Sequence, residues 1–521
     1  MRIFLACVAL AAALLAPGLL VGPSLDAAVF AEVAERMRAG AMLYVDAWDH
    51  KPPGVYLLLV AARTLLPWFG PWLVSWIVSV LATAATATTL HAICRRLGLS
   101  ALACWVAAVG ALVVMGQYLT ALGGGLTEPF ATLLLAVALL LALGSWGRDD
   151  QLVRPAAVGA VLGLAAMLSV QVLPAILPIG WLMIPRNGKS AATGISVLVA
   201  GIAGFLAPLV LVAAWLTVIG SFGGATDAVL TYTAAYRSVA GRTGVALGGP
   251  VLAWTLLALL FLAVPAAMGA AEGRRRGGVW SAAALASMAW IGIAIVSFAV
   301  QGRLFAHYVI PLSIPLALLA GLGAERLRAL PKRHRSRLLL PIAATCVISA
   351  LAAGVAGAME LGPISRDHAQ SVAIAKILDQ ESEAEDRIWV WGNEPEVYLD
   401  SDRESATSYS YMYPLVTPGY TTPALIAATL ADLERDPPKL IVDAGSTAPG
   451  QPGFQQLLIP RPLASDGRDL DLLDPLRGFV RERYTELDRT SGWVVYVRRD
   501  SAGAPDARRG SSQLRLAATR R

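Results

Sequence analysis

Uninterrupted apolar segments alternate with short polar segments from the N-terminus to about residue 358. Many of them reach the roughly 18 residues that a helix needs to cross a lipid bilayer. The pattern therefore predicts a polytopic α-helical membrane protein with about eleven transmembrane helices. The predicted spans lie near residues 3–22, 70–93, 101–119, 129–146, 155–170, 172–185, 191–218, 249–270, 279–300, 309–324 and 338–358.

Positively charged residues predict how these spans are oriented. Lys and Arg are more frequent in the alternate loops that include Arg2, Arg95–Arg96 and Arg274–Arg276 than in the loops between them. Under the positive-inside rule the N-terminus is cytoplasmic, and an odd number of spans places the C-terminal region outside the cytoplasm. The first segment is also compatible with a signal peptide, although its length favours an uncleaved span.

The polar C-terminal part of the chain has a different pattern, without segments long enough to cross a membrane. Residues 359–499 are predicted to form a small extracytoplasmic α/β domain that follows a transmembrane domain at 1–358. Its expected elements are strands at 386–391, 439–442 and 493–497 and amphipathic helices at 371–378 and 423–433. The last segment, 500–521, is basic, has no apolar period and is expected to be disordered.

The composition agrees with a membrane protein. The 521 residues are 56% hydrophobic and only 15% charged, with a mean hydropathy of +0.61, whereas soluble domains carry about 25% charged residues. The net charge of +6 contributes to orientation in such a protein and does not indicate nucleic-acid binding. The four cysteines fall in or beside apolar runs without Cys-x-x-Cys spacing, so neither a disulfide framework nor a zinc site is expected.

The first outer loop, residues 23–69, carries much of the polar chemistry. Asp26 directly follows the first span, in a stretch that predicts an amphipathic helix in the headgroup plane. Its carboxylate can serve in catalysis or can simply cap that helix. The residues expected on the water-facing side of the helix are Glu32, Glu35, Arg36 and Arg38, opposite Val29, Phe30, Val33 and Met37.

Farther along this loop, polar and aromatic residues surround a rigid Lys-Pro-Pro-Gly segment. Lys51, held beside the double proline, can pair with a lipid phosphate. The alternative is an interfacial anchor, in which Lys51 extends to the membrane surface beside Trp48. The other residues of this cluster, which we expect to support the loop, are Tyr44, Asp46, Asp49, His50, Pro52, Pro53 and Tyr56.

The other outer loops add single candidates. Glu128 lies at the mouth of a span, where it can act chemically or cap the helix before Pro129, and His307 is either a site residue or part of an aromatic belt. Arg237 and Arg303 are available cations. No charged residue lies in the middle of a predicted span, which favours chemistry at the outer surface over ion-coupled transport. Five side chains of the outer loops could together bind a divalent cation: His50, His307, Asp46, Asp49 and Glu128. Their spacing matches no metal-binding motif, so the sequence assigns no metal site.

An acidic residue after the first span, followed by YVDAWDHKPPGVY at Tyr44–Tyr56, resembles the GT-C membrane glycosyltransferases. The similarity is strongest to the branch with bacterial relatives of the dolichyl-phosphate-mannose protein mannosyltransferases, the lipid A aminoarabinose transferases and the Rgt-type lipopolysaccharide glycosyltransferases. Further family-like stretches are TEP at Thr127–Pro129, GRLFAHYVIPLSIPLAL at Gly302–Leu318 and VWGNEPEVY at Val390–Tyr398. Asp26 is followed by an alanine, where many relatives have a second acidic residue.

The resemblance implies a GT-C-like fold in the plasma membrane. It implies an enzyme that moves a sugar, mannose or similar, from a polyprenyl-phosphate carrier to an extracytoplasmic lipid, glycan or protein acceptor. Asp26 is then the catalytic carboxylate, Glu128 a second acidic position, and Lys51 the partner of the donor phosphate. Arg303 and His307 fall where the family's late outer loop approaches the site. With Arg237 they are further candidates for the phosphate, and a single carboxylate base predicts inversion.

Two other classes of protein remain open from the sequence. A lipid-linked glycan flippase or other transporter would move its substrate without making a glycosidic bond. A membrane-anchored assembly protein would bind its partners through the outer domain, and changes at Lys51 would then be silent.

Overall fold

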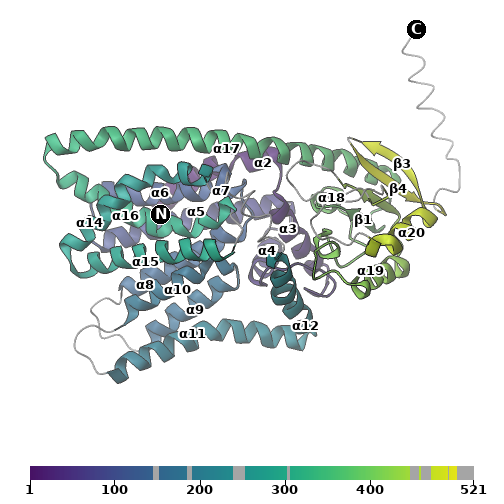
Figure 1. Ribbon diagram of the computed structural model, residues 1–521, viewed down its shortest axis with the longest axis horizontal. Coiled ribbons are helices and arrows are strands. Elements are labelled where there is room, and N and C mark those ends of the chain that lie inside the picture. Colours follow the sequence, from purple (N-terminus) through teal and green to yellow (C-terminus); the bar gives the residue numbers. More distant parts are fainter. Residues whose placement is uncertain are drawn as a thin grey trace, which may run out of the picture. The chain divides into compact units, whose positions relative to one another are not determined.

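A computed structural model of the protein describes residues 1–144, 152–184, 191–238, 253–301, 305–445, 457–458, 471–490 and 492–500 (Figure 1). The chain up to Ala329 is largely helical. Its helical elements are α1 (Arg2–Leu15), α2 (Pro17–Val21), α3 (Leu25–Arg38), α4 (Gly54–Leu65), α5 (Pro71–Arg96), α6 (Ala101–Gly116), α7 (Tyr118–Ala121), α8 (Thr127–Gly144), α9 (Val153–Ala166), η1 (Val170–Val172), α10 (Leu173–Met183), α11 (Ala191–Val218), α12 (Phe222–Thr226), η2 (Asp227–Tyr232), η3 (Leu260–Leu262), α14 (Ala263–Arg276), α15 (Gly278–Gln301), η4 (Ala306–Leu312) and α16 (Ser313–Ala329).

Eight helical segments of the described chain are long and apolar enough to cross a membrane. They are Arg2–Val21, Pro71–Arg96, Thr127–Gly144, Ala192–Val218, Ala253–Arg276, Gly278–Val300, Ala306–Ala329 and Lys332–Glu381. The prediction of a polytopic helical membrane protein is therefore confirmed, and each of these segments overlaps a predicted span.

The other three predicted spans form shorter apolar helices. The segment predicted at 101–119 ends as a helix at Gly116, because Gln117 has an extended backbone with ψ of 141°. The resulting 16 residues measure about 24 Å, less than the roughly 30 Å of a bilayer core. Between the segments predicted at 155–170 and 172–185, the extended backbone of Ser169 separates α9 from η1 and α10.

Small residues let several of these helices approach closely. A Cβ atom added to Gly323 of α16 would lie 1.9 Å from the carbonyl oxygen of Pro265 on α14, and one added to Gly269 would lie 1.8 Å from the carbonyl oxygen of Leu319. Helices in lipid pack mainly through such close van der Waals contact. The pairing of α14 and α16 (Figure 1) therefore depends on glycine at both positions.

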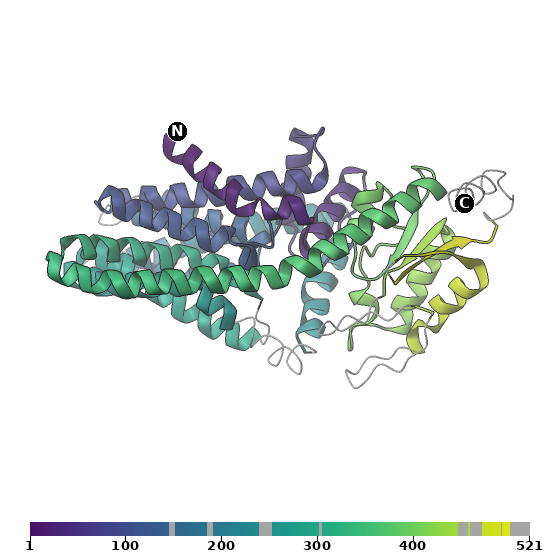
Figure 2. The same cartoon turned by 90° about the horizontal axis from the view of Figure 1, so that it is seen from above.

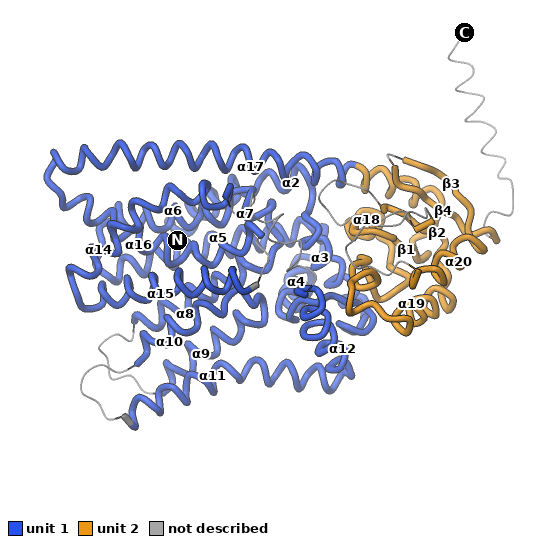
Figure 3. The backbone as a smooth tube through the Cα atoms, viewed as in Figure 1, with its two compact units in different colours: residues 1–369 blue, residues 370–521 orange. Residues whose placement is uncertain are grey.

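The longest helix, α17 (Lys332–Glu381), continues through Pro341 and Pro363 (Figure 2). It contains both the span predicted at 338–358 and the helix predicted at 371–378, which the sequence pattern treats as separate elements. The chain divides within this helix into two compact units, Met1–Ala369 and Gln370–Arg521 (Figure 3). Residues 501–521 of the predicted tail lie outside the described residues.

The second unit contains a mixed four-stranded sheet in the order β1-β2-β4-β3, with β1 and β2 parallel and the other pairs antiparallel. One face packs on the end of α17 through Ile374 and Leu378. The predicted strands and the helix at 423–433 are present here. The elements are β1 (Ile388–Trp391), α18 (Glu396–Ser401), η5 (Tyr413–Leu415), α19 (Pro423–Arg435), β2 (Leu440–Asp443), η6 (Asp471–Leu473), α20 (Asp474–Arg483), β3 (Tyr484–Thr490) and β4 (Trp493–Arg498).

Candidate active site

Asp26 lies in the first turn of α3. The N-cap position of this helix is occupied by Ser24, whose backbone is extended, so Asp26 is not the capping residue. A carboxylate in the first turn faces the positive end of the helix dipole. The Asp26 side chain is 37% exposed, which leaves it accessible to a substrate.

The structure brings Lys51 next to Asp26. The Lys51 Nζ atom lies 4.0 Å from Oδ2 of Asp26 and 6.0 Å from the centre of the Phe30 ring. Burial alone would lower the pKa of Lys51, but the negative charges of Asp26, Glu128 and other nearby groups outweigh it and raise the pKa above its usual value. Lys51 therefore stays cationic among acidic groups, although its side chain is only 21% exposed.

The Lys-Pro-Pro-Gly turn is fixed from both ends. The Tyr44 hydroxyl donates to the carbonyl oxygen of Lys51 at 2.8 Å. Pro53 precedes the first residue of α4, and the Gly54 N–H donates to the carbonyl oxygen of Met167 at 2.9 Å. A Cβ atom on Gly54 would lie only 2.6 Å from that oxygen, so this contact requires glycine.

A buried network lies beneath Lys51. The Tyr56 hydroxyl donates to Oδ2 of Asp49, and Nδ1 of His50 lies 3.0 Å from Oδ1 of the same carboxylate. Asp49 and Tyr56 are both buried. The His50 ring in turn lies 5.3 Å from Tyr232. These contacts link Asp49, His50 and Tyr56 of the loop to one another and to Tyr232.

Glu128 and His307 approach the same place from two other helical elements. Glu128 is buried in the first turn of α8, where Oε1 lies 3.4 Å from the Ser169 hydroxyl. His307 is buried in η4 beside Phe305, with the ring centres 5.4 Å apart. Electrostatic interactions connect His307 to Glu128, Asp26 and Lys51.

Three further predicted residues contribute differently. Asp46 is exposed, and its Oδ2 accepts the N–H of Met42 at 2.8 Å, which closes the turn before the cluster. Arg237 is exposed one residue after Tyr236, whose ring lies 5.9 Å from that of His50. Arg303 lies outside the described residues. Within the part of the chain that the structure describes, no group of three or more His, Cys, Asp or Glu residues could hold a metal ion.

The prediction that Glu32 of α3 faces water is wrong, whereas Arg38 is exposed and Val29, Phe30 and Val33 are buried as expected. Residues Ala27–Ala34 are all buried, and this includes Glu32, which was expected to face water. The reason is that α4 and α5 both pack against α3. The charged residues are accommodated by ion pairs instead, because Glu32 lies 3.7 Å from Arg36 and Glu35 lies 2.6 Å from Arg63.

Sequence reasoning missed two residues of the site. Ser169, which contacts Glu128, falls at the end of a predicted span and carries no motif. Tyr308 interacts electrostatically with Lys51, and only its position beside His307 could have indicated it.

Neither a family model nor a curated protein sequence matches this chain. Its fold is similar to that of ArnT from Cupriavidus metallidurans. The structure of ArnT bound to undecaprenyl phosphate aligns with a TM-score of 0.56 and 15% identity, over 96% of this chain and 99% of that chain. The apo structure aligns with a TM-score of 0.55 and 13% identity, over 94% and 95%. This likeness confirms the expected fold over nearly the whole chain.

Proposed function

We propose that this chain is a membrane glycosyltransferase that moves a sugar from a polyprenyl-phosphate carrier to an extracytoplasmic acceptor. The observation that carries the proposal is the pairing of an accessible carboxylate, Asp26, with a cationic Lys51 at 4.0 Å. The fold shared with ArnT, which has been solved with undecaprenyl phosphate, supports a polyprenyl-phosphate donor. The excess of Lys and Arg in the alternate loops supports a site on the extracytoplasmic side.

The proposed reaction uses both members of the pair. The carboxylate of Asp26 takes the proton from the acceptor hydroxyl as that oxygen bonds to the anomeric carbon. The bond from that carbon to the phosphate oxygen breaks, and the lipid phosphate leaves with the bonding electrons. Lys51 stabilises the departing phosphate. Displacement in one step predicts inversion at the sugar.

The surrounding residues have supporting roles in this proposal. Glu128 and His307 interact electrostatically with Lys51, and Arg237 is a second cation for the phosphate. The Asp49 network holds the loop backbone in place. The sugar is proposed to be mannose or a similar one, and the acceptor a lipid, a glycan or a protein.

A donor screen tests this function. The purified full chain in lipid nanodiscs is incubated with polyprenyl-phosphate mannose, glucose, galactose and arabinose and a mixture of envelope acceptors, and the products are read by mass spectrometry. We expect a new glycosidic product from at least one donor. We expect the Asp26→Asn variant to be about 10³-fold slower, because it lacks the base.

Asp46→Asn is the matched control. Asp46 is an exposed carboxylate of the same loop, and asparagine can still accept the Met42 N–H. We expect this variant to keep its activity. Equal activity of wild type and Asp26→Asn, or donor movement across the bilayer without a new glycosidic bond, contradicts the proposal.

A further inference from the structure

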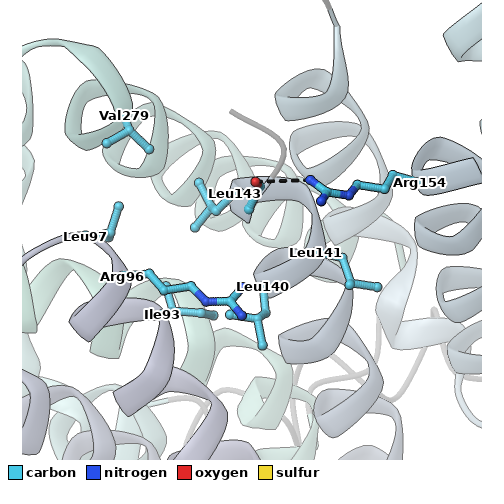
Figure 4. Close-up of a pocket in the computed structure, with 9 residues that line it drawn as sticks. Ile93, Arg96, Leu97, Leu140, Leu141, Leu143, Arg154 and Val279 are labelled. Carbon is cyan, nitrogen blue, oxygen red and sulfur yellow. Dashed lines mark hydrogen bonds between the residues drawn. The ribbon is translucent and has the colours of Figure 1, made fainter. Parts of the chain in front are cut away.

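A polar pocket lies away from the candidate active site. It has a volume of about 640 Å³ and is lined from α5, α8, α9 and α15 (Figure 4). Its walls combine apolar side chains with two guanidinium groups, Arg96 and Arg154. No Asp or Glu is among its described lining residues. The apolar lining consists of Ile93, Leu97, Leu140, Leu141, Leu143 and Val279.

The two arginines converge on the C-terminal end of α8. Nη1 of Arg154 donates to the carbonyl oxygen of Gly144 at 3.2 Å. Nη1 of Arg96 lies 3.3 Å from the position that a Cβ atom of Gly144 would occupy. Figure 4 shows Arg96 entering from one side and Arg154 from the other, with leucines of α8 between them. Two cations thus lie near the C-terminal end of α8, beside its leucines.

The position of the pocket along the helices indicates its depth in the membrane. It is lined by the last residues of α5 and α8 and the first residues of α9 and α15. Glu128 of the candidate active site lies at the opposite end of α8, 16 residues before Gly144 by sequence number. At about 1.5 Å per residue this is roughly 24 Å, so the two sites lie near opposite surfaces of the bilayer.

The pocket combines two guanidinium groups with leucine side chains. Basic pockets between transmembrane helices at a membrane surface are suited to anionic lipid headgroups.

We propose that this pocket binds the phosphate headgroup of an anionic glycerophospholipid of the inner leaflet. Arg96 and Arg154 bind the phosphate, because a guanidinium presents several N–H donors to phosphate oxygens in a fixed geometry. Leu140 and Leu143 contact the upper part of an acyl chain. A phosphate without a lipid tail would leave these leucine surfaces uncovered, which favours the lipid as the occupant.

Native mass spectrometry of the full chain tests this site. The protein is delipidated and exchanged into phosphatidylglycerol or phosphatidylcholine of equal chain length, and the retained lipid is counted. We expect wild type to retain phosphatidylglycerol preferentially. We expect Arg96→Gln and Arg154→Gln each to weaken this retention about fivefold, as follows from about 1 kcal/mol per basic residue at a membrane surface.

Arg95→Gln is the matched control. Arg95 and Arg96 are both exposed, but only Arg96 lines the pocket, so this variant removes the same charge from the adjacent position without changing the pocket lining. Leu143→Trp keeps both arginines and fills the pocket, and it should lose retention as Arg96→Gln does. Equal retention of the two lipids by wild type overturns the proposal. So does a loss in Arg95→Gln as large as in Arg96→Gln, or displacement of the lipid by millimolar inorganic phosphate, which would assign the pocket to a free anion.

Discussion

The guanidinium of Arg63 on α4 holds both carboxylate oxygens of Glu35 on α3, with Nε 2.6 Å from Oε1 and Nη2 3.2 Å from Oε2. Its Nη1 atom donates to the backbone carbonyl of Leu66 at 3.2 Å and to that of Phe69. Arg63 is buried. This one side chain therefore joins the helix that carries Asp26 to the end of the helix that follows Lys51.

Replacing Arg63 with alanine should destabilise the protein strongly. It removes the two contacts from Arg63 to the Glu35 carboxylate and the donor to three backbone carbonyls, those of Leu66, Pro67 and Phe69, at a cost of about 3 kcal/mol. The apparent Tm in nanodiscs should fall by several degrees. Arg63→Lys should also be less stable than wild type, because an ammonium group cannot reproduce the two parallel contacts.

Arg38 provides the control for this prediction. Its Nε lies 3.2 Å from the same Glu35 carboxylate, but its side chain is 39% exposed. Arg38→Gln should change stability by less than about 1 kcal/mol. If Arg38→Gln lowers the Tm as much as Arg63→Ala does, the buried ion pair between Arg63 and Glu35 contributes no more to stability than the exposed pair between Arg38 and Glu35.

Gly54→Ala should reduce transfer without unfolding the protein. The new Cβ atom would lie 2.6 Å from the backbone oxygen of Met167, so the turn that carries Lys51 must move away. A displacement of this size in a catalytic group can cost about 100-fold in rate. Gly70→Ala is the control, since a Cβ atom there meets nothing within 4 Å. Initial rates of the two variants, measured after equal reconstitution, decide the prediction.

Lys51→Met should reduce kcat/KM for the donor by about 10²–10³-fold, the usual effect of losing one electrostatic stabiliser of the transition state. Lys51→Arg should recover part of this loss, because it restores the positive charge near Asp26. Steady-state kinetics with the donor identified in the screen measure both variants. If Lys51→Met has wild-type kinetics, Lys51 does not bind the donor phosphate, and the alternative role as an interfacial anchor is favoured.

The stability of the second unit should depend on pH through Asp443. Burial raises the pKa of this carboxyl to about 7, even though it accepts N–H groups from Leu457 and Gly445. The folded state therefore binds a proton that the unfolded state, with a pKa near the ordinary value of about 3.9, has released. The free energy of unfolding should fall as pH rises from about 4 to about 7 and stay level above that range.

Amide hydrogen exchange of the β2 peptides in the full chain, corrected for intrinsic exchange rates, measures this dependence. Protection should decrease across that pH range in wild type. In Asp443→Asn the decrease should be absent, because no group at this position titrates. An equal decrease in both proteins would assign the effect to another residue.

The overall architecture was predictable because a membrane-spanning helix requires a long uninterrupted run of hydrophobic residues, which the sequence shows directly. The strand β3 was missed, since its sequence YTELDRT is largely polar and only its first residue is buried. An edge strand of this kind is defined by its partner β4, which the local sequence does not reveal. The count of spans was less predictable, because Gln117 and Ser169 end helices through backbone conformations that hydropathy does not report.

The site was predictable to a different extent. The resemblance singled out Asp26 and Lys51, which lie 25 residues apart by sequence number and 4.0 Å apart in space. The burial of Glu32 could not be foreseen, because it depends on helices that cover α3 from elsewhere in the chain. Ser169 was likewise hidden, since its role depends on a contact with Glu128 across 41 positions.

The length of α8 has a consequence for the surrounding lipid. Its 18 residues measure about 27 Å, slightly less than the hydrocarbon thickness of a typical bilayer. The helix is largely buried by neighbouring helices, so only its lipid-facing residues meet acyl chains. With polar groups at both ends, these residues favour a hydrocarbon core close to the helix length. Turnover should accordingly depend on acyl-chain length. In shorter-chain lipids, the headgroup region of a membrane-embedded donor should lie level with Glu128.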